Sequence, residues 1–518
     1  MPQPANILFI TSDQQHWGEL GFLNPEVRTP NLDRLARRGT CFSRAYTVNP
    51  TCTPTRCSWI SGTYPSQHGA YSLGTKMFED VPTVNDVFRK ANFRTALIGK
   101  AHFQPLMATP EYPSLESYPL LHDLDFWREY KGPFYGFDTF ELARNHVDEP
   151  HVGQHYALWM ESKGCKNWRD YFLPNYYTPP GDKFPDSKHI QRKPGEAWDI
   201  PEELHYNAWI AERTNAVMDD FKADDKPFFL WASFFDPHPV YMVPEPYASM
   251  YDPAKVTVPE HTPGEFDDKP PHFAMTQQPG ADFSAYYNEP NNDGHHLHGA
   301  GCHLKSREEK AKNIAMMYGM MTMLDTYIGK ILDHLEEQGL ADDTLVVFTS
   351  DHGDFWGQHG LTAKCLHHYE DLVRVPLIAA LPGQIPAGKT CADLQSTVDL
   401  APTFLSFAGL PVPRWMTGLD RKANWEGDAS CARRHVMVEN HHNPTKFHIE
   451  TLVNARYKIT VYRDADHGEL YDLEADPGEL VNLWDHPDRL ALKQKMLLEF
   501  CQARMEAQPM PMPRIAGA

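Results

Sequence analysis

A cysteine followed at fixed spacing by a proline and an arginine is the part of this sequence best suited to chemistry. Residues 52–56 read Cys-Thr-Pro-Thr-Arg. Pro54 suits the first turn of a helix, where its missing N–H is not needed. Cys52 would then lie at the positively polarised start of that helix, which stabilises an anionic nucleophile and an oxyanion substrate. Arg56 adds a permanent positive charge. The pattern predicts a nucleophilic site; the alternative is a buried cysteine in a loop.

Two apolar runs have an aspartate at or just after their carboxyl ends. Residues 6–15 carry Asp13 near their end, and residues 345–350 are followed directly by Asp351. Buried parallel strands present ligands at their carboxyl ends, and oxygen ligands from separate strands can surround a hard divalent cation. A lone aspartate after a strand is more often a helix cap or turn residue. Together with Cys52, however, the two runs predict a metal site.

Four lysines and histidines follow other predicted strands or lie in the loop after one: Lys100, His102, His238 and Lys364. A histidine exchanges protons near neutral pH, and a lysine close to a dication has a lowered pKa and can donate a proton. A single histidine is usually structural. The shared position of all four residues after strands favours a functional role.

The elements that must position these residues alternate between strand and helix. Helices are predicted over 30–38, 83–90 and 308–338, and strands over 41–47, 93–98 and 227–235. Ile, Leu and Met recur at helical spacing through 308–338, which is typical of a core helix. This alternation predicts an α/β fold with a large, mostly parallel sheet between layers of helices.

Other regions lack this rhythm. Residues 107–201 and 239–302 have little periodicity and are predicted insertions, of the kind that form lids, substrate walls or oligomer contacts. Strands predicted over 435–439, 457–462 and 469–472 are followed by a predicted helix over 488–504. We therefore expect a catalytic domain at 1–430 and a smaller α+β domain with an antiparallel sheet at 431–518. The proline-rich end, 508–518, is expected to contact a partner subunit in a homodimer or homotetramer.

Composition limits the class of protein. With 41% hydrophobic and 12% aromatic residues, the 518-residue chain can bury a large core. The formal net charge of -21 disfavours binding to nucleic acid or to an anionic membrane surface. No apolar run reaches the roughly 20 residues that span a bilayer. Nine cysteines form no evident disulfide framework, and the first residues lack a targeting pattern, so we expect a cytoplasmic protein.

In their order along the chain, these motifs resemble those of the type I sulfatases of the alkaline phosphatase superfamily. The resemblance extends from Asn6 to about Leu483 and is carried by residues 52–56, 99–102, 350–353 and Lys364. It implies an alkaline phosphatase-like fold and arylsulfatase-like hydrolysis of a small-molecule sulfate ester. It also implies that a maturation enzyme oxidises Cys52 to formylglycine. One hydroxyl of the hydrated aldehyde would attack the ester, and the other would later expel the bound group.

The resemblance implies roles for individual residues as well. One divalent cation would be held by Asp13, Gln14, Cys52, Asp351 and His352. The catalytic group would comprise Cys52, Arg56, Lys100, His102, His238 and Lys364. Its lysines and histidines would bind ester oxygens, hold the formylglycine hydroxyl and protonate the leaving oxygen.

Gln14 departs from the pattern of many sulfatases, which have a second aspartate there. An Asp-Gln pair together with an Asp-His pair resembles the branch of choline sulfatases and phosphonate monoester hydrolases. The lost carboxylate and the added nitrogen ligand admit Mn²⁺, although Ca²⁺ remains favoured. The alternatives are therefore a phosphonate monoester or phosphodiester hydrolase, or a choline-sulfatase-like alkyl sulfatase. The segment 99–102, which the phosphonate branch typically lacks, favours sulfate.

Overall fold

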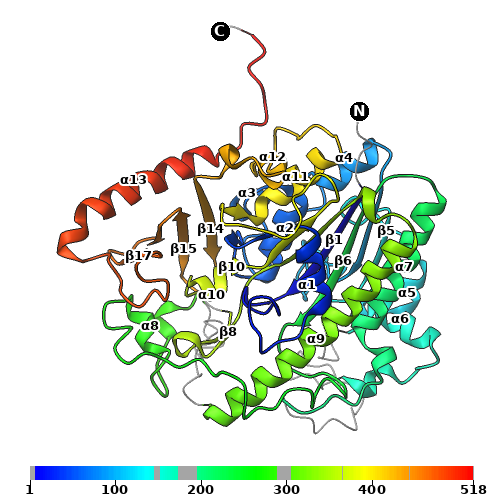
Figure 1. Ribbon diagram of the computed structural model, residues 1–518, viewed down its shortest axis with the longest axis horizontal. Coiled ribbons are helices and arrows are strands. Elements are labelled where there is room, and N and C mark those ends of the chain that lie inside the picture. The colour runs from blue at the N-terminus through cyan, green and yellow to red at the C-terminus, as the bar shows by residue number, and fades with distance from the viewer. Residues whose placement is uncertain are drawn as a thin grey trace.

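A sheet of eight strands forms the centre of the protein in the computed structural model, which describes residues 6–144, 152–172, 195–288, 305–364, 366–442 and 444–516. The strands lie in the order β12-β2-β11-β7-β1-β6-β4-β5, and Figure 1 labels β1, β6 and β5 of this sheet. In that order their bounds are Lys389–Cys391, Thr40–Phe42, Leu377–Ala380, Thr344–Ser350, Asn6–Asp13, Phe228–Pro237, Arg94–Gly99 and Thr139–Leu142. Strands β7, β1, β6, β4 and β5 are parallel, whereas β11 is antiparallel to both neighbours. The predicted, mostly parallel sheet is confirmed.

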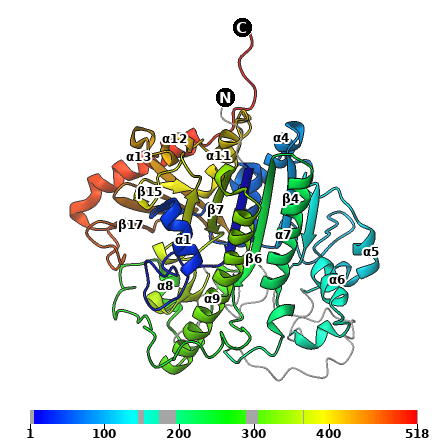
Figure 2. The same ribbon diagram turned by 45° about the vertical axis from the view of Figure 1, so that its right-hand side comes forward.

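Both faces of the sheet are buried. In β1, Leu8 and Ile10 belong to one apolar cluster, whereas Ile7 and Phe9 belong to the other, because successive side chains of a strand point to opposite faces. The first face is covered by α1 (Pro30–Arg38), α6 (Gln154–Ser162), α7 (Tyr206–Ala223) and α9 (Arg307–Glu337). Helices α7 and α9 lie side by side across it (Figure 2). The second face is covered by α2 (Cys52–Ser61), α4 (Val84–Lys90) and α11 (Leu400–Phe407).

Most predicted elements lie within one or two residues of the observed ones, but the single strand predicted over 41–47 is wrong. Strand β2 ends at Phe42, and the chain turns before β3 (Ala45–Tyr46). Strand β3 belongs to a separate sheet with β10 (Arg374–Val375) and β13 (Gln395–Ser396). The N–H of Ser43 donates to the carbonyl of Cys391 at 2.9 Å, which is the last of these bonds to the large sheet. The turn that follows interrupts the strand, because it carries the chain away from the large sheet.

The C-terminal part of the chain forms a small antiparallel sheet, as predicted. Its order is β14-β15-β16-β17, with bounds His435–His441, His448–Asn454, Tyr457–Tyr462 and Gly468–Asp472. Helix α13 (Leu490–Glu506) packs Met496 and Ala503 against apolar residues of this sheet. The sequence analysis missed β15, the strand that joins β14 to β16. The division into domains at about residue 430 stays a prediction.

Part of the region 107–201 belongs to the large sheet, because it contributes the edge strand β5. It also contains α5 (Leu124–Glu129) and α6.

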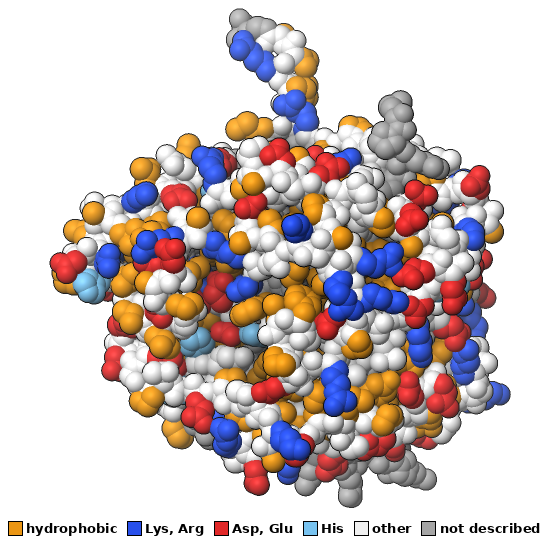
Figure 3. Space-filling view, in the orientation of Figure 1, with side chains coloured by type: hydrophobic (Ala, Val, Ile, Leu, Met, Phe, Trp, Pro, Cys, Tyr) orange, Lys and Arg blue, Asp and Glu red, His pale blue; other side chains and the backbone are white. Residues whose placement is uncertain are grey.

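Within the described residues, every helix is too short or too polar to cross a membrane. Acidic and basic side chains are mixed over the face shown in Figure 3. The net negative charge therefore does not appear there as one continuous patch.

Candidate active site

Three elements bring the candidate nucleophile and metal ligands to one edge of the sheet. Strand β1 ends at Asp13, and β7 ends immediately before Asp351. Cys52 is the first residue of α2, with Pro54 in the first turn, as the sequence predicts. The turn after Asp351 needs Gly353, because a Cβ atom there would lie 2.0 Å from the backbone oxygen of Asp371.

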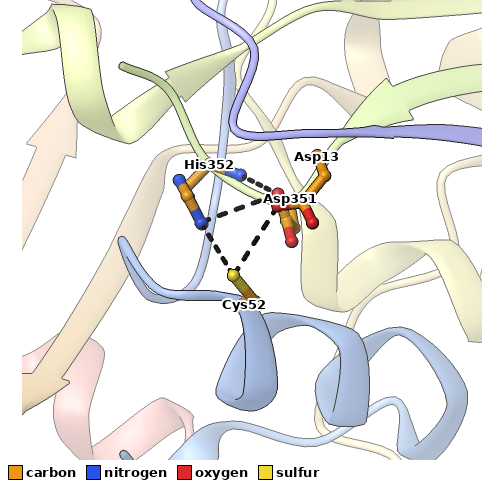
Figure 4. A group of neighbouring side chains, drawn as sticks. All are labelled: Asp13, Cys52, Asp351 and His352. Atoms are coloured by element: carbon orange, nitrogen blue, oxygen red, sulfur yellow. Dashed lines mark hydrogen bonds and ion pairs between the residues drawn. The ribbon is translucent and has the colours of Figure 1, made fainter. Parts of the chain in front are cut away.

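The ligand atoms of Asp13, Cys52, Asp351 and His352 all lie within 4.8 Å of one another, and all four residues are buried. The Cys52 Sγ lies 3.6 Å from Oδ1 of Asp13 and 3.3 Å from Nε2 of His352. Figure 4 shows Cys52 at the start of its helix, pointing toward the other three. Two carboxylates, an imidazole and the side chain at position 52 form a donor set suited to one divalent cation.

Gln14 lies beside this donor set, since its backbone N–H donates to Oδ1 of Asp351 at 3.0 Å. Its Nε2 donates to Oδ1 of Asp354 at 3.0 Å, which fixes the orientation of the amide. Its Oε1 is buried and accepts no hydrogen bond from any described residue. A buried carbonyl oxygen without a partner is costly unless a ligand meets it. The cation predicted from the sequence therefore fits the residues present.

Lys364 and His238 contact each other and the nucleophile position. The Lys364 Nζ lies 3.2 Å from the Cys52 Sγ and 3.1 Å from the Nε2 of His238. The other ring nitrogen of His238 contacts the carbonyl oxygen of Pro239. Since a carbonyl oxygen only accepts, that nitrogen carries a proton, and the Nε2 of the neutral ring accepts from Lys364. The pair thus holds protons next to the nucleophile.

Lys100 forms an ion pair with Asp13 from the loop after β4. Burial raises the pKa of Asp13, but Lys100 and other cations hold it well below its ordinary value. Burial and Asp13 likewise raise the pKa of the Cys52 thiol, but Lys100 and Lys364 outweigh them and lower it. The site therefore favours negative charge on the atom that occupies the nucleophile position.

His102 lies two residues beyond Lys100, in a left-handed conformation with a φ of 59°. Its Nδ1 is buried without a hydrogen-bond partner among the described residues. Burial and the nearby charges of Arg144 and Lys100 lower its pKa well below the ordinary value. The ring is therefore neutral near pH 7, which leaves a nitrogen available as an acceptor.

Arg56 faces inward. Its Nε donates to Oδ2 of Asp351 at 2.8 Å, and its Nη1 donates to the carbonyl of Lys100 at 3.1 Å and to Oγ of Ser233 at 2.9 Å. The side chain is fully buried. Arg56 therefore holds a metal-ligand candidate and the Lys100 loop in place, while its Nη2 lies 3.8 Å from Oδ2 of Asp13 without a hydrogen-bond partner among the described residues.

We use the name strand-end cluster for the candidate ligands and catalytic residues at this edge of the sheet: Asp13, Gln14, Cys52, Lys100, His102, His238, Asp351, His352 and Lys364.

Residues 5–410 of the chain match the sulfatase family. The chain belongs to the sulfatase family. Residues 357–506 also match the family described as N-sulphoglucosamine sulphohydrolase, C-terminal. Sulfatases are hydrolases that act on sulfate esters, and this sulfatase is accordingly an enzyme of that class.

Relatives of this sulfatase span nearly its whole length. It is 28% identical over 515 residues to an arylsulfatase of Clostridium perfringens, covering 97% of this chain and 95% of the relative. It is 26% identical over 498 residues to a choline-sulfatase of Rhizobium meliloti, covering 93% and 83%. The structure of a phosphonate monoester hydrolase from Silicibacter pomeroyi has the same fold, with a TM-score of 0.76, 24% identity and coverage of 98% and 96%. The resemblance drawn from the motifs, including its branch, is confirmed.

Sequence reasoning missed four side chains around the site of this sulfatase: Ser233, Asp354, Glu116 and Arg144. Ser233 and Asp354 orient Arg56 and Gln14, respectively. Asp354 lies one residue beyond a recognised motif, so its position was a usable signal. Glu116 and Arg144 lie in the region 107–201, where no periodicity pointed to them.

Proposed function

We propose that this sulfatase hydrolyses sulfate monoesters by nucleophilic attack from a formylglycine formed at Cys52, with one divalent cation at the strand-end cluster. The observation that carries the proposal is the convergence on the Cys52 Sγ of Asp13, His352 and Lys364 at 3.6, 3.3 and 3.2 Å. In this proposal the Cys52 sulfur stands in for the attacking hydroxyl oxygen of the formylglycine. The hydrated aldehyde supplies that hydroxyl and a second one that later expels the sulfate group.

The cation is proposed to be Ca²⁺, with Mn²⁺ as the alternative. Asp13, Gln14, Asp351 and His352 would hold it together with the modified residue 52. When bound, it polarises an ester oxygen and lowers the pKa of the nucleophile. Three oxygen donors from side chains favour Ca²⁺, whereas the imidazole admits Mn²⁺.

The chain's own residues divide the remaining work. Lys100 neutralises Asp13 and presents its charge at the edge where the ester's negative oxygens would lie. The neutral ring of His102 accepts a proton or hydrogen bond from the nucleophile's hydroxyl. The pair of Lys364 and His238 protonates the leaving oxygen. We assign the transfer to His238: its Nε2 takes a proton from the Lys364 ammonium and passes it to the leaving oxygen, and Lys364 regains its proton from water. Imidazole suits this role because it exchanges protons in both directions near neutral pH.

The runner-up is a phosphonate monoester or phosphodiester hydrolase, and a choline-sulfatase-like alkyl sulfatase is a variant of the first proposal. The presence of Gln14 and His352, together with the shared fold of the phosphonate enzyme, supports the runner-up. Lys100 and His102 favour sulfate, because the phosphonate branch typically lacks that segment.

Two measurements test the proposal. Mass spectrometry of the peptide containing Cys52 should show the aldehyde in place of the thiol. The same preparation should then cleave para-nitrophenyl sulfate faster than a phenyl phosphonate ester. An unmodified thiol in fully active protein would refute the formylglycine mechanism, and a preference for the phosphonate ester would support the runner-up.

We also propose a cytoplasmic location and a homo-oligomeric state for the protein. Within the described residues no disulfide links the cysteines, which supports a reducing cytoplasm. The chain after α13 extends away from the body in Figure 1, which supports the proposal of a homodimer or homotetramer. Measuring the molar mass in solution, with and without residues 508–518, tests the second point.

A further inference from the structure

Arg144 is a buried arginine beside the strand-end cluster that donates no hydrogen bond to any described residue. It is 5% exposed, and its Nε is buried without a partner. Among the described residues it forms an ion pair with Glu116, at 3.6 Å from Nε to Oε2, which is too long for a hydrogen bond. Arg56, by contrast, donates from Nε and Nη1 to three acceptors, and only its Nη2 is buried without a hydrogen-bond partner among the described residues. A buried guanidinium with unused donors needs an explanation, since such groups are normally paired.

The backbone places Arg144 at the active-site edge of the sheet. Strands β4 and β5 are paired in register at Gly99 and Leu142, and the N–H of Ala143 donates to the carbonyl of Gly99 at 3.2 Å. Lys100 directly follows Gly99, and Arg144 follows Leu142 by two residues, so both lie just beyond the carboxyl ends of these neighbouring strands. The charge of Arg144 interacts with those of Cys52 and Asp13, although the net effect of burial lowers the pKa of this arginine.

Glu116 does not account for the position of Arg144, because its carboxylate already has partners. Its Oε1 accepts from the backbone N–H groups of Phe103 and Gln104 at 2.8 and 3.2 Å. Its Oε2 accepts from the N–H of His102 at 3.0 Å. Glu116 thus holds the loop that carries His102, and the Nε of Arg144 is left without a hydrogen-bond partner among the described residues.

We propose that Arg144 is a substrate-binding residue that places its guanidinium against an anionic group with two adjacent oxygens on the bound ester. This assignment rests on the proposed function. The planar fork of a guanidinium matches such a group with two parallel hydrogen bonds. The group is either the sulfate being transferred or a second acidic substituent on the alcohol, such as a carboxylate.

The test compares Arg144→Ala and Arg144→Lys with Arg213→Ala as a matched control. Arg213 bonds to Glu141 of the same strand β5 at 2.8–2.9 Å, but lies outside the site and is partly exposed. Two quantities are measured for each variant: the inhibition constant of inorganic sulfate, and kcat/KM for an aryl sulfate with and without a ring carboxylate. Melting temperatures check that each variant folds.

If Arg144 binds the transferred group, Arg144→Ala weakens sulfate inhibition and lowers kcat/KM for both esters, each roughly 10–100-fold, the value of one charged hydrogen-bonded contact. If it binds a second acidic group, the inhibition constant of sulfate is unchanged and kcat/KM falls only for the ester that carries the ring carboxylate. Arg144→Lys keeps the positive charge but not the planar guanidinium, so its losses of inhibition and of kcat/KM should be smaller. If the alanine variant does not fold, the lysine variant tests the proposal in its place. A folded variant with neither change overturns the proposal.

A binding measurement separates this inference from the proposed function. In a Cys52→Ala background, which cannot turn over the ester, calorimetry gives the affinity for inorganic sulfate and for the carboxylate ester with and without Arg144. A loss of affinity on removing Arg144 supports the inference even if the wild-type protein shows no sulfatase activity. Equal affinities for both ligands refute it even if the wild-type protein is active.

Discussion

Two largely buried groups of ionisable side chains meet at Asp354, whose Oδ1 accepts from Gln14 and whose N–H donates to the carbonyl of Asp371. The two groups differ in how fully they are paired. The second group, called the His359 cluster, comprises His16, Glu265, His359 and Asp371. The Nδ1 of His359 lies 3.3 Å from Glu265, its Nε2 lies 3.5 Å from Asp371, and Asp371 also bonds to His16 at 2.9 Å. Its ring stacks on Tyr369, with centroids 3.7 Å apart. Every nitrogen of His359 therefore has a partner within the protein.

The strand-end cluster and its surroundings are incomplete by comparison. Oε1 of Gln14, Nδ1 of His102 and Nε of Arg144 are buried without hydrogen-bond partners among the described residues. Leaving such atoms unpaired costs free energy, which a bound cation and an anionic substrate would recover. Pairing, rather than charge alone, therefore separates a ligand-binding cluster from a structural one in this protein. The following predictions test that distinction, in order of expected effect.

Replacing Cys52 by alanine should abolish turnover and leave the fold intact, because the residue supplies the nucleophile at the start of α2. Steady-state rates and the melting temperature measure the two effects. Cys57→Ala is the matched control in the same helix, since burial raises the pKa of Cys57 well above its ordinary value and favours a packed thiol. Comparable losses of activity in both variants would contradict the assignment.

Asp351→Asn should lower the rate by roughly a thousandfold or more, because it removes a charged ligand from the proposed cation site. Chelation of the wild-type protein should inactivate it, and adding back Ca²⁺ or Mn²⁺ should restore activity to an extent that identifies the metal. Elemental analysis measures occupancy alongside the rate. Full activity in metal-free protein would show that the strand-end cluster does not depend on a cation.

Arg56→Lys should weaken metal binding by roughly 10–100-fold, as expected when a partner that orients a ligand is lost. A lysine retains the charge but cannot reproduce the bonds to Asp351, Lys100 and Ser233 together. Titration with the metal, followed by activity at saturating metal, separates positioning from direct catalysis. Recovery of most of the rate at saturation supports positioning; an unchanged deficit favours contact with the ester.

His238→Ala should slow alkyl sulfates by roughly 10²–10⁴-fold and activated nitrophenyl sulfates much less, because a poor leaving group needs the proton more. The measurement is log rate against leaving-group pKa for the wild type and the variant. A steeper dependence in the variant supports His238 as the acid. Parallel lines would assign protonation to Lys364, which lies 3.1 Å away, or to water.

His359→Gln should leave kcat almost unchanged and alter the dependence of stability on pH. Burial alone would lower the pKa of His359, but Asp371 and Glu265 raise it from 6.5 to about 9. Because the folded pKa is the higher one, this stabilisation is fully present below pH 6.5 and is lost as the pH rises through about 9. The groups that face the ring from neighbouring elements are Asp371, Glu265, Tyr369 and His367.

Urea denaturation from pH 6 to 10 measures this effect. The wild type should lose free energy of unfolding on the order of 2 kcal/mol between pH 7 and pH 10 from this residue, and the variant should lack that loss. His334→Gln is the control, since His334 pairs with Asp219 at the surface. A large fall in kcat for His359→Gln at neutral pH would break the distinction between the two clusters.

The sequence alone determined the α/β layering and most of the strand-end cluster. Apolar runs such as residues 6–12 and 344–350 are readable as buried strands, and parallel strands necessarily bring Asp13 and Asp351 to one edge. The start of α2 follows from Pro54, which suits a first turn. These inferences succeed because each depends on periodicity or on backbone preferences within a short stretch of chain.

Only the tertiary structure decided how the side chains are paired. The contact between Lys364 and His238 joins residues 126 positions apart, and that between Arg56 and Asp351 joins residues 295 apart. Neither partner alters the local sequence pattern around the other, so these contacts could not be predicted from the sequence. Arg144 lay unnoticed in a region without periodicity, because β5 is a four-residue edge strand whose place is set by pairing with β4. Hydrogen-bond satisfaction, which separates the two buried clusters, depends on packing across the whole fold.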